Sequence, residues 1–410
     1  MIEELEKFLE ERNNGAYERD AYDRYCQKRS LSLDAPAIHV TGSNGKGSTI
    51  HYLEAIYMAA GYHVASFIKP AFFCLNECIR YDGEEISDAE LSSLFQDNKK
   101  DFEKFKLSEF ECSVALAYRY FNKKKPDIVL VEAGMGGLVD ATNIEKMDVR
   151  LAIITTISLE HTAYLGTTLS SIALHKAGII KEETPVLVGK IDEDSEKIIL
   201  EQAQAFSAPF HKVDSYHFDH LDEQGYHFDY GPYKDIILQT KARYQVANAA
   251  MAIEATAILQ KDFPVNEESI RKGLSTKPLP GRLEIIGRIV IDGAHNPEGI
   301  NSLSANLATV ANGRPIYALF ASFRDKNIAV ELPRLANSVV AITLTTFDHP
   351  RARGEDDYFL YVGDHPFVAD PEEALDNLLK EHENALIVIT GSLAFAGLMR
   401  KIVLEKRKGI

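Results

Sequence analysis

Short apolar runs alternate with longer amphipathic segments along most of this chain, and this alternation constrains the fold more than any other feature. The apolar runs of the first half lie at residues 37–40, 63–68, 127–134, 151–158 and 184–189. Between two of them, residues 109–125 carry apolar side chains at helical spacing. Because neighbouring parallel strands need a crossover connection that is usually a helix, the pattern predicts an α/β protein with a mostly parallel sheet.

The pattern changes twice in the second half of the chain. Residues 208–240 alternate aromatic and polar side chains, which is typical of antiparallel hairpins. Residues 276–284 contain two prolines and a glycine and predict a linker, with the boundary between Lys277 and Arg288. After it the α/β rhythm restarts. We therefore expect two domains, residues 1–280 and 281–410: a P-loop-type, mostly parallel sheet domain with a small antiparallel section, then a smaller Rossmann-like α/β domain.

Composition excludes several classes of protein. The 410 residues carry a formal net charge of −16, which argues against a general nucleic-acid binder with its basic face. Four cysteines are scattered, and Cys74 and Cys78 do not form a zinc-binding pair. The acidic N-terminus is unlike a signal peptide, and no stretch approaches the ~20 apolar residues that span a membrane. We expect a soluble cytoplasmic protein that contacts neither nucleic acid nor membrane.

A glycine-rich loop, HVTGSNGKGSTIHYLEAI, lies at residues 39–56. It departs slightly from the strict phosphate-loop pattern G-x-x-x-x-G-K-[ST], because Gly42 lies only three residues before Gly45 and Gly47 follows Lys46. The loop joins an expected strand to an expected helix, whose N-terminus favours anions. An ordinary glycine-rich turn is the alternative, but Lys46 and the hydroxyl pair after it favour phosphate binding.

The second strong motif is DIVLVEAGMGGLVDATNI. It begins with an expected buried strand that ends at Glu132, and glycines follow. Because ligands gather at the carboxyl ends of parallel strands, Glu132 is expected to share a crevice with Lys46. A carboxylate beside a bound triphosphate is explained by a bridging magnesium ion. The alternative is a structural acidic residue that caps a neighbouring helix.

Two further residues invite a choice between a functional and a structural role. His161 follows the next strand of the same predicted sheet and is either a ligand or a structural histidine. Lys176 lies in an otherwise apolar helical segment, where an unpaired ammonium is costly. Such a lysine has an anionic partner, a lowered pKa or a chemical modification.

In the second domain, Arg282 follows the linker, and Asp292 and His295 end the first strand. Strand-end Asp and His side chains again indicate a crevice. We therefore expect the nucleotide in a cleft between the two domains, with Lys46 and Asp292 both turned toward it.

Seven motifs occur in an order that resembles one known family: TGSNGKGST, VEAGMGGLVDATN, LEHTAYLG, HKAGIIK, YQVANAA, PGRLE and DGAHNP. Together they resemble the folylpolyglutamate synthase/dihydrofolate synthase family, within the wider Mur-ligase-type amide ligases. The resemblance extends from about residue 38 to TGSLAFAG near the C-terminus. Only about 40 residues precede the loop, too few for the extra N-terminal domain of Mur ligases proper.

The resemblance implies ATP-dependent joining of L-glutamate to a folate γ-carboxylate or to the carboxylate of dihydropteroate, through an acyl phosphate, by a protein that we expect to be a monomer. The implied ATP-binding residues are Gly42, Ser43, Asn44, Gly45, Lys46, Gly47, Ser48, Thr49, Asn248, Arg282 and Asp292. The implied Mg²⁺ ligands are Glu132, His161 and Lys176, the last as a carbamate. The implied catalytic residues are Lys46, Lys176 and His295. His295 and Ser392 are the implied acyl-acceptor site.

The chain also departs from the family pattern. Lys69-Pro70-Ala71 replaces Ser-Pro-His, whose serine binds magnesium, and Asn76-Glu77-Cys78-Ile79 replaces N-E-R-I. Leu138 replaces an arginine and Glu160 an aspartate. Because an ammonium and a dication repel each other, Lys69 is expected either to contact phosphate and weaken the first magnesium site or to turn to solvent. The departures leave two alternatives open: a paralogue that uses a non-folate carboxylate, and a nucleotide-binding relative without catalysis.

Overall fold

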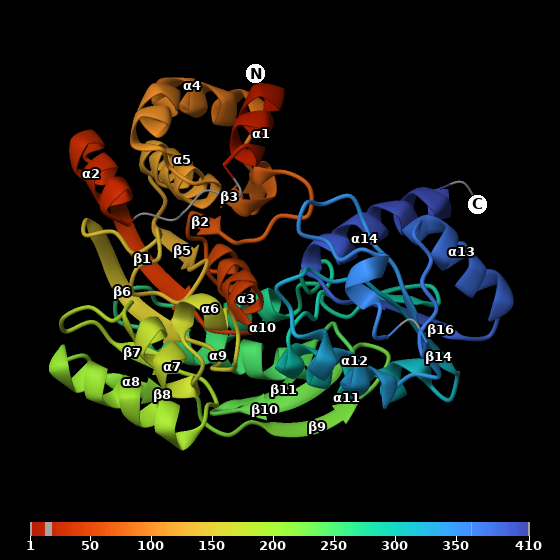
Figure 1. Ribbon diagram of the computed structural model, residues 1–410. Helices are drawn as coiled ribbons and strands as arrows, with labels where there is room; N and C mark the ends of the chain where they lie inside the picture. Colours follow the sequence, from red (N-terminus) through yellow and green to blue (C-terminus); the bar gives the residue numbers. More distant parts are fainter. Residues whose placement is uncertain (1, 13–18, 362, 409–410) are drawn as a thin grey trace. The chain divides into compact units, whose positions relative to one another are not determined.

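The computed structural model describes residues 2–12, 19–361 and 363–408 (Figure 1). It divides the chain into two compact units. The first unit comprises residues 1–220, 227–238 and 245–276, and the second comprises residues 221–226, 239–244 and 277–410.

The first unit is built on an eight-stranded sheet with the order β4-β3-β2-β5-β1-β6-β7-β8. Its strands are β1 (Leu33–Thr41), β2 (Val64–Phe67), β3 (Ile79–Tyr81), β4 (Glu84–Glu85), β5 (Ile128–Glu132), β6 (Met147–Ile154), β7 (Val186–Val188) and β8 (Phe210–Lys212). The strands from β2 to β8 in this order pair in parallel, whereas β3 and β4 form an antiparallel edge. Every residue of β5 is buried, which is why the four residues before Glu132 form a continuous apolar run in the sequence.

Helices cover this sheet through two apolar clusters. The helices of the unit are α1 (Ile2–Glu10), α2 (Arg19–Arg29), α3 (Lys46–Ala59), α4 (Asp88–Phe105), α5 (Glu109–Lys124), α6 (Thr162–Leu165), α7 (Leu169–Ala177), α8 (Glu193–Ala205), α9 (Tyr244–Ile258) and α10 (Glu267–Leu274). One cluster joins α1, α2, α4 and α5 to the sheet, and the other joins α7 and α8 to β6 and β7. Helix α5 begins with a capping box between Ser108 and Glu111, which fixes its first turn.

A three-stranded sheet follows, with the order β11-β10-β9. Its strands are β9 (His217–Leu221), β10 (Tyr226–Tyr230) and β11 (Tyr233–Leu238). They lie within residues 208–240, whose aromatic–polar alternation predicted hairpins, whereas β8 at the start of that segment joins the large sheet as a parallel strand.

The second unit has a five-stranded sheet with the order β12-β13-β16-β14-β15. Its strands are β12 (Glu284–Ile286), β13 (Ile289–Ile291), β14 (Ile316–Phe320), β15 (Ala341–Leu344) and β16 (Leu386–Thr390), and only β12 is antiparallel among the pairs. Its α-helices are α11 (Pro297–Ala311), α12 (Ile328–Ala336), α13 (Pro371–Glu381) and α14 (Leu393–Lys408). Two apolar clusters share the strands of this sheet, one with α11 and α12 and the other with α13 and α14, as in a doubly wound sheet. The predicted fold class is confirmed.

Candidate active site

The glycine-rich loop leaves the carboxyl end of β1 and requires glycine at two positions. Gly42 has φ +147°, and a Cβ atom there would lie 1.9 Å from Thr155 Oγ1. Gly45 has φ +87°, and its Cβ would lie 2.4 Å from Asn248 Oδ1. Positive φ and close approach both exclude larger residues. The glycines therefore let the loop backbone approach Thr155, just after β6, and Asn248 on α9.

Two threonines that follow β6 hold the loop in place. The Ser43 N–H donates to the Thr156 carbonyl at 2.9 Å, and the Asn44 N–H donates to Thr156 Oγ1 at 2.9 Å. Thr155 Oγ1 donates to the Asn44 carbonyl at 2.6 Å. Sequence reasoning did not select these threonines. The Thr-Thr pair directly after a buried strand was the available signal.

Helix α3 begins at Lys46, with Gly45 as its N-cap residue. Because glycine has no side chain, the N-cap residue cannot itself satisfy the N–H groups of the first turn, and these groups attract anions. On the α9 side, Asn248 Nδ2 donates to Gln245 Oε1 at 2.9 Å, and Gln245 Nε2 donates to Ser48 Oγ at 3.3 Å. The structure thus brings Asn248 to the loop, and it adds Gln245, which sequence reasoning had missed.

The side chain of Lys46 lies over its own loop and near Glu132. Its Nζ donates to the Gly42 carbonyl at 2.8 Å and lies 3.8 Å from Glu132 Oε1. The Glu132 side chain is only 6% exposed at the end of β5. The strand ends therefore bring the predicted phosphate-binding lysine and the predicted metal-binding carboxylate together.

A glycine turn after β5 connects this pair to α7. The Thr41 hydroxyl donates a hydrogen bond to the Gly136 carbonyl, which ties the turn to the end of β1. A Cβ atom on Gly137 would lie 3.0 Å from the Lys176 carbonyl, and the Leu138 N–H donates to the His175 carbonyl at 2.8 Å. The turn therefore holds the C-terminal part of α7, which carries Lys176, close to the end of β5.

Lys176 is buried and has an anionic partner. Its side chain is 1% exposed, and its Nζ lies 2.8 Å from Glu160 Oε1. Burial lowers the pKa of Lys176, opposed by the charge of Glu160. Burial raises the pKa of Glu160, but the charges of Lys176 and Lys46 outweigh it and lower this pKa to about 2. Two of the three explanations offered for this lysine, an anionic partner and a lowered pKa, therefore apply together.

His161 is adjacent to this pair and has an unusual backbone conformation. It is the N-cap of α6 with φ 46°, in the left-handed region, and its charge contributes to lowering the pKa of Glu160. Within the described part of the chain, Glu132 and His161 belong to no group of three or more His, Cys, Asp or Glu whose ligand atoms all lie within 4.8 Å of one another. These side chains therefore offer at most an incomplete coordination shell.

The expectation for Lys69 was wrong. Its ammonium neither reaches the phosphate loop nor turns to solvent, because it pairs with Glu109 at the start of α5. The Lys69 side chain is 16% exposed, and its Nζ lies 5.7 Å from the centre of the Phe110 ring. The Phe110 ring in turn packs against Gly134. The acidic first residues of α5 supplied a partner that residue type alone did not reveal.

In the second unit, Asp292 organises the end of β13. Its Oδ2 accepts hydrogen bonds from Tyr244 Oη at 2.9 Å and from the Leu283 N–H at 2.8 Å, and its Oδ1 accepts from the Ala294 N–H at 2.9 Å. Burial raises the pKa of Asp292, whereas the Arg282 guanidinium opposes this rise. Arg282 and Asp292 are thus brought together, and Tyr244 is a partner that sequence reasoning had missed.

His295 and Ser392 lie at the ends of neighbouring strands of the second unit. His295 Nδ1 lies 2.8 Å from the Gly293 carbonyl, which orients the ring. Ser392 Oγ accepts a hydrogen bond from the Phe395 N–H at 3.0 Å in the first turn of α14. The Gly391 N–H donates to the Ala294 carbonyl at 3.1 Å, so the two strand ends are linked.

Both units match models of one enzyme class. Residues 40–256 match the Mur ligase middle domain, and residues 281–393 match the Mur ligase, glutamate ligase domain. Proteins built from these two domains are ATP-dependent amide ligases, and this chain is one of them. No helix in the described residues has the length and apolar character that a membrane crossing requires.

Individual relatives identify the family within this class of amide ligases. The chain is 33% identical to a dihydrofolate synthase/folylpolyglutamate synthase of Bacillus subtilis, over 89% of this chain and 90% of that protein. It is also 33% identical to a folylpolyglutamate synthase of Lacticaseibacillus casei, over 90% of each. The Mycobacterium tuberculosis folylpolyglutamate synthase complexed with ADP and AMPPCP superposes with a TM-score of 0.89 at 25% identity, over 98% of both chains. The chain belongs to the folylpolyglutamate synthase/dihydrofolate synthase family.

Proposed function

We propose that this protein uses ATP to join L-glutamate to the carboxylate of a folate or of dihydropteroate. The carboxylate attacks the γ-phosphate of ATP, which yields an acyl phosphate and ADP. The glutamate amine then displaces inorganic phosphate and forms the amide. Support comes from the relatives named above and from E. coli FolC in complex with DHPP and ADP, which superposes with a TM-score of 0.87 at 25% identity.

The observation that carries this proposal is the position of Lys46. Its ammonium lies at the N-terminus of α3 and 3.8 Å from Glu132, with the loop glycines folded beneath it. A triphosphate at this helix N-terminus would receive backbone N–H groups and the Lys46 charge together. Carboxylates attack phosphate slowly, so charge neutralisation and positioning by these groups would provide most of the rate enhancement.

The residues around Lys46 fit a magnesium ion that is bound mainly by phosphate. Mg²⁺ commonly takes only one or two protein ligands and fills its shell with phosphate oxygens and water. Glu132 and His161 would hold it, and when bound it would neutralise charge on the β- and γ-phosphates. Glu132 is only 6% exposed and lies 3.8 Å from Lys46, so its carboxylate is close to the place where the loop would hold the phosphates.

We further propose that the Lys176 side chain is carbamylated. Carbamylation forms a bond between the neutral amine nitrogen and the carbon of CO₂ and releases a proton, and burial lowers the Lys176 pKa and so favours the neutral amine. A carbamate beside Glu160 would place two anions together in a buried site. A second magnesium ion would then compensate for them, and the same position would remain a simple ion pair without the modification.

In the second unit, the polar side chains near the ends of β13 and β16 would bind the substrates. Asp292 and Arg282 would contact ATP, and His295 and Ser392 would contact the glutamate that accepts the acyl group. Asp292 is held by three hydrogen-bond donors, so its orientation is fixed before any ligand arrives. We further propose that the protein acts in the cytoplasm as a monomer.

Phosphate release with a panel of carboxylate substrates tests the proposal. The purified protein is incubated with ATP, Mg²⁺ and L-glutamate, and with dihydropteroate, tetrahydrofolate or a simple dicarboxylate in turn. We expect glutamate-dependent phosphate release with at least one pterin substrate and a product heavier by one glutamyl residue. Release only with a non-pterin carboxylate would establish the paralogue instead. Nucleotide binding without release under any condition would establish a relative that has lost catalysis.

A further inference from the structure

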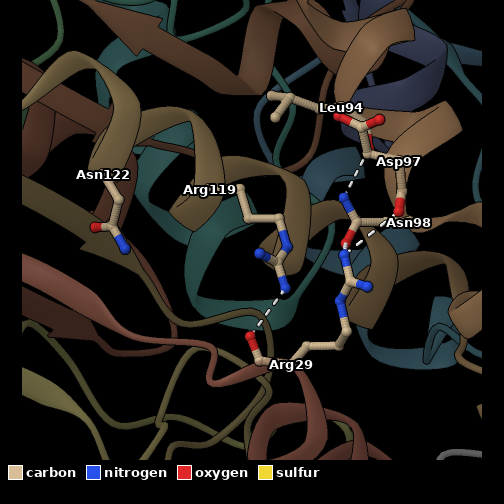
Figure 2. A pocket seen from close by; sticks show the side chains of 6 residues that line it. All are labelled: Arg29, Leu94, Asp97, Asn98, Arg119 and Asn122. Carbon is tan, nitrogen blue, oxygen red and sulfur yellow. Dashed lines mark hydrogen bonds between the residues drawn. The ribbon is translucent and has the colours of Figure 1, made fainter.

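A separate polar cavity of about 480 Å³, broadly open to solvent, lies in the first unit (Figure 2). It is lined by Arg29, Leu94, Asp97, Asn98, Arg119 and Asn122. These residues come from the last turn of α2, the middle of α4 and the last two turns of α5. Cavities of a few hundred Å³ are large enough to hold small metabolites.

The cavity lies at the opposite end of β1 from the phosphate loop. Asn122 Nδ2 donates to the Ser32 carbonyl at 2.9 Å, and Asn122 Oδ1 accepts from the Asp34 N–H at 3.1 Å. Both contacts are at the beginning of β1, whereas Gly42 follows its end. A strand of this length spans roughly 30 Å. A small ligand in the cavity would therefore not reach Lys46.

The guanidinium of Arg119 interacts with the Tyr25 hydroxyl, but it is not fully paired. Its Nη2 lies 3.4 Å from the Arg29 carbonyl, which is long for an N–H···O hydrogen bond. Its Nε is buried and has no hydrogen-bond partner among the described residues. Most neighbours of Arg119 on α5 are buried. Within the described chain, no carboxylate forms an ion pair with the Arg119 guanidinium. A buried donor without a partner is unfavourable, so an added acceptor would stabilise this arrangement.

The cavity also has an excess of positive charge in an acidic protein. Asp101 pairs with Arg29 at 3.1 Å and with Lys28 at 2.7 Å, so two cations share one carboxylate. Asp97 adds a second negative charge to the lining and Arg119 a third positive charge. One positive charge therefore remains over among these five groups, against a net charge of −16 for the whole chain.

We propose that this cavity is an accessory binding site for a small oxyanion, a carboxylate or phosphate metabolite, held between Arg119 and Arg29. Figure 2 shows the guanidinium groups of both arginines among the lining side chains. The planar guanidinium fork matches the two oxygens of a carboxylate or phosphate. The site goes beyond the ligation reaction, because none of the residues assigned to ATP, magnesium or glutamate lines it.

Anion titration of the full chain tests the site. Inorganic phosphate and glutarate are titrated separately by calorimetry without nucleotide or magnesium, in the Lys46→Ala variant, which weakens phosphate binding at the glycine-rich loop. We expect one equivalent of at least one anion to bind, and the stronger of the two identifies the preferred class. Adding Arg119→Gln is expected to weaken binding about tenfold or more, since charged hydrogen bonds are lost.

Three further variants complete the experiment. Arg29→Lys keeps a charge for Asp101 but removes the fork, and it is expected to weaken binding as well. Lys123→Gln removes one charge from the exposed side of α5 and is expected to leave affinity unchanged. Arg119→Lys replaces Arg119→Gln if that variant does not fold. Absence of binding in the Lys46→Ala protein, or equal affinity with and without the Arg119 substitution, would overturn the proposal.

Discussion

Two lysine–glutamate pairs lie in the same region of the first unit, and they differ in how firmly the lysine is held. Lys46 is 16% exposed and lies 3.8 Å from Glu132, whereas Lys176 is 1% exposed and lies 2.8 Å from Glu160. The first lysine is the first residue of α3, directly after the glycine-rich loop, and the second lies near the end of the packed helix α7. The comparison indicates that Lys46 can move to an incoming phosphate, while Lys176 can act only where it is.

The largest expected effect follows from replacing Lys176 by alanine. This change leaves the Glu160 charge buried without its partner, so we expect a loss of about 3–5 kcal/mol in the free energy of unfolding. If the carbamate forms, ligation is abolished while binding of an ATP analogue changes little. Urea unfolding and calorimetry measure the two effects. Near-normal turnover would reduce Lys176 to a structural residue, and the double variant with Glu160→Gln controls for the unpaired charge.

Lys46→Ala is expected to affect catalysis rather than folding. A preorganised cation at the phosphates contributes about as much as an oxyanion-hole donor, so kcat/KM should fall by roughly 10²–10³. Unfolding by urea should change by less than about 1 kcal/mol, since the side chain is partly exposed and its ion pair is long. Steady-state kinetics with ATP as the varied substrate provides the measurement. A large decrease in the free energy of unfolding would show that Lys46, like Lys176, is needed for the stability of the fold.

The acid branch of the stability curve contains a contribution from the tighter pair, which the Glu160→Gln variant isolates. Glu160 has a folded pKa of about 2, below its ordinary value of 4.5, so its contribution is present above pH 4.5 and is lost as the pH falls toward 2. Lys176 stays protonated in both states at this pH, so it does not add to the slope. The loss amounts to about 3 kcal/mol. Glu160→Gln should flatten this part of the curve in urea titrations, and Glu132→Gln serves as the comparison.

The smallest expected effect concerns Lys69. Because its ammonium pairs with Glu109, Lys69→Ser should cost under about 1 kcal/mol of stability, as for partly exposed ion pairs. The magnesium concentration for half-maximal activity should not change. A marked decrease in that concentration would mean that Lys69 leaves Glu109 when ligands bind and competes with the metal, which would add a third lysine to the comparison.

Much of the molecule was readable in the sequence. The alternation of strands and helices followed from apolar periodicity, and the small sheet within residues 208–240 followed from the alternation of aromatic and polar side chains, because each element buries one face or both. Lys46 was predicted from the glycine-rich loop, and Glu132 and His161 were predicted near it because parallel strands end at one edge of a sheet. The motifs added the family, which the matched domains and relatives show.

Side-chain pairing, in contrast, was decided by the tertiary structure. Lys69 was placed wrongly because its partner Glu109 is 40 residues away and belongs to another element. Thr155 and Thr156 were missed because their function is to hold a loop that is distant in the sequence. The sequence by itself determined the elements, their class and the catalytic family, since these depend on local periodicity and contiguous motifs. Which cation meets which carboxylate depended on packing between elements, since ion pairs and hydrogen bonds act over a few ångströms of space regardless of separation along the chain.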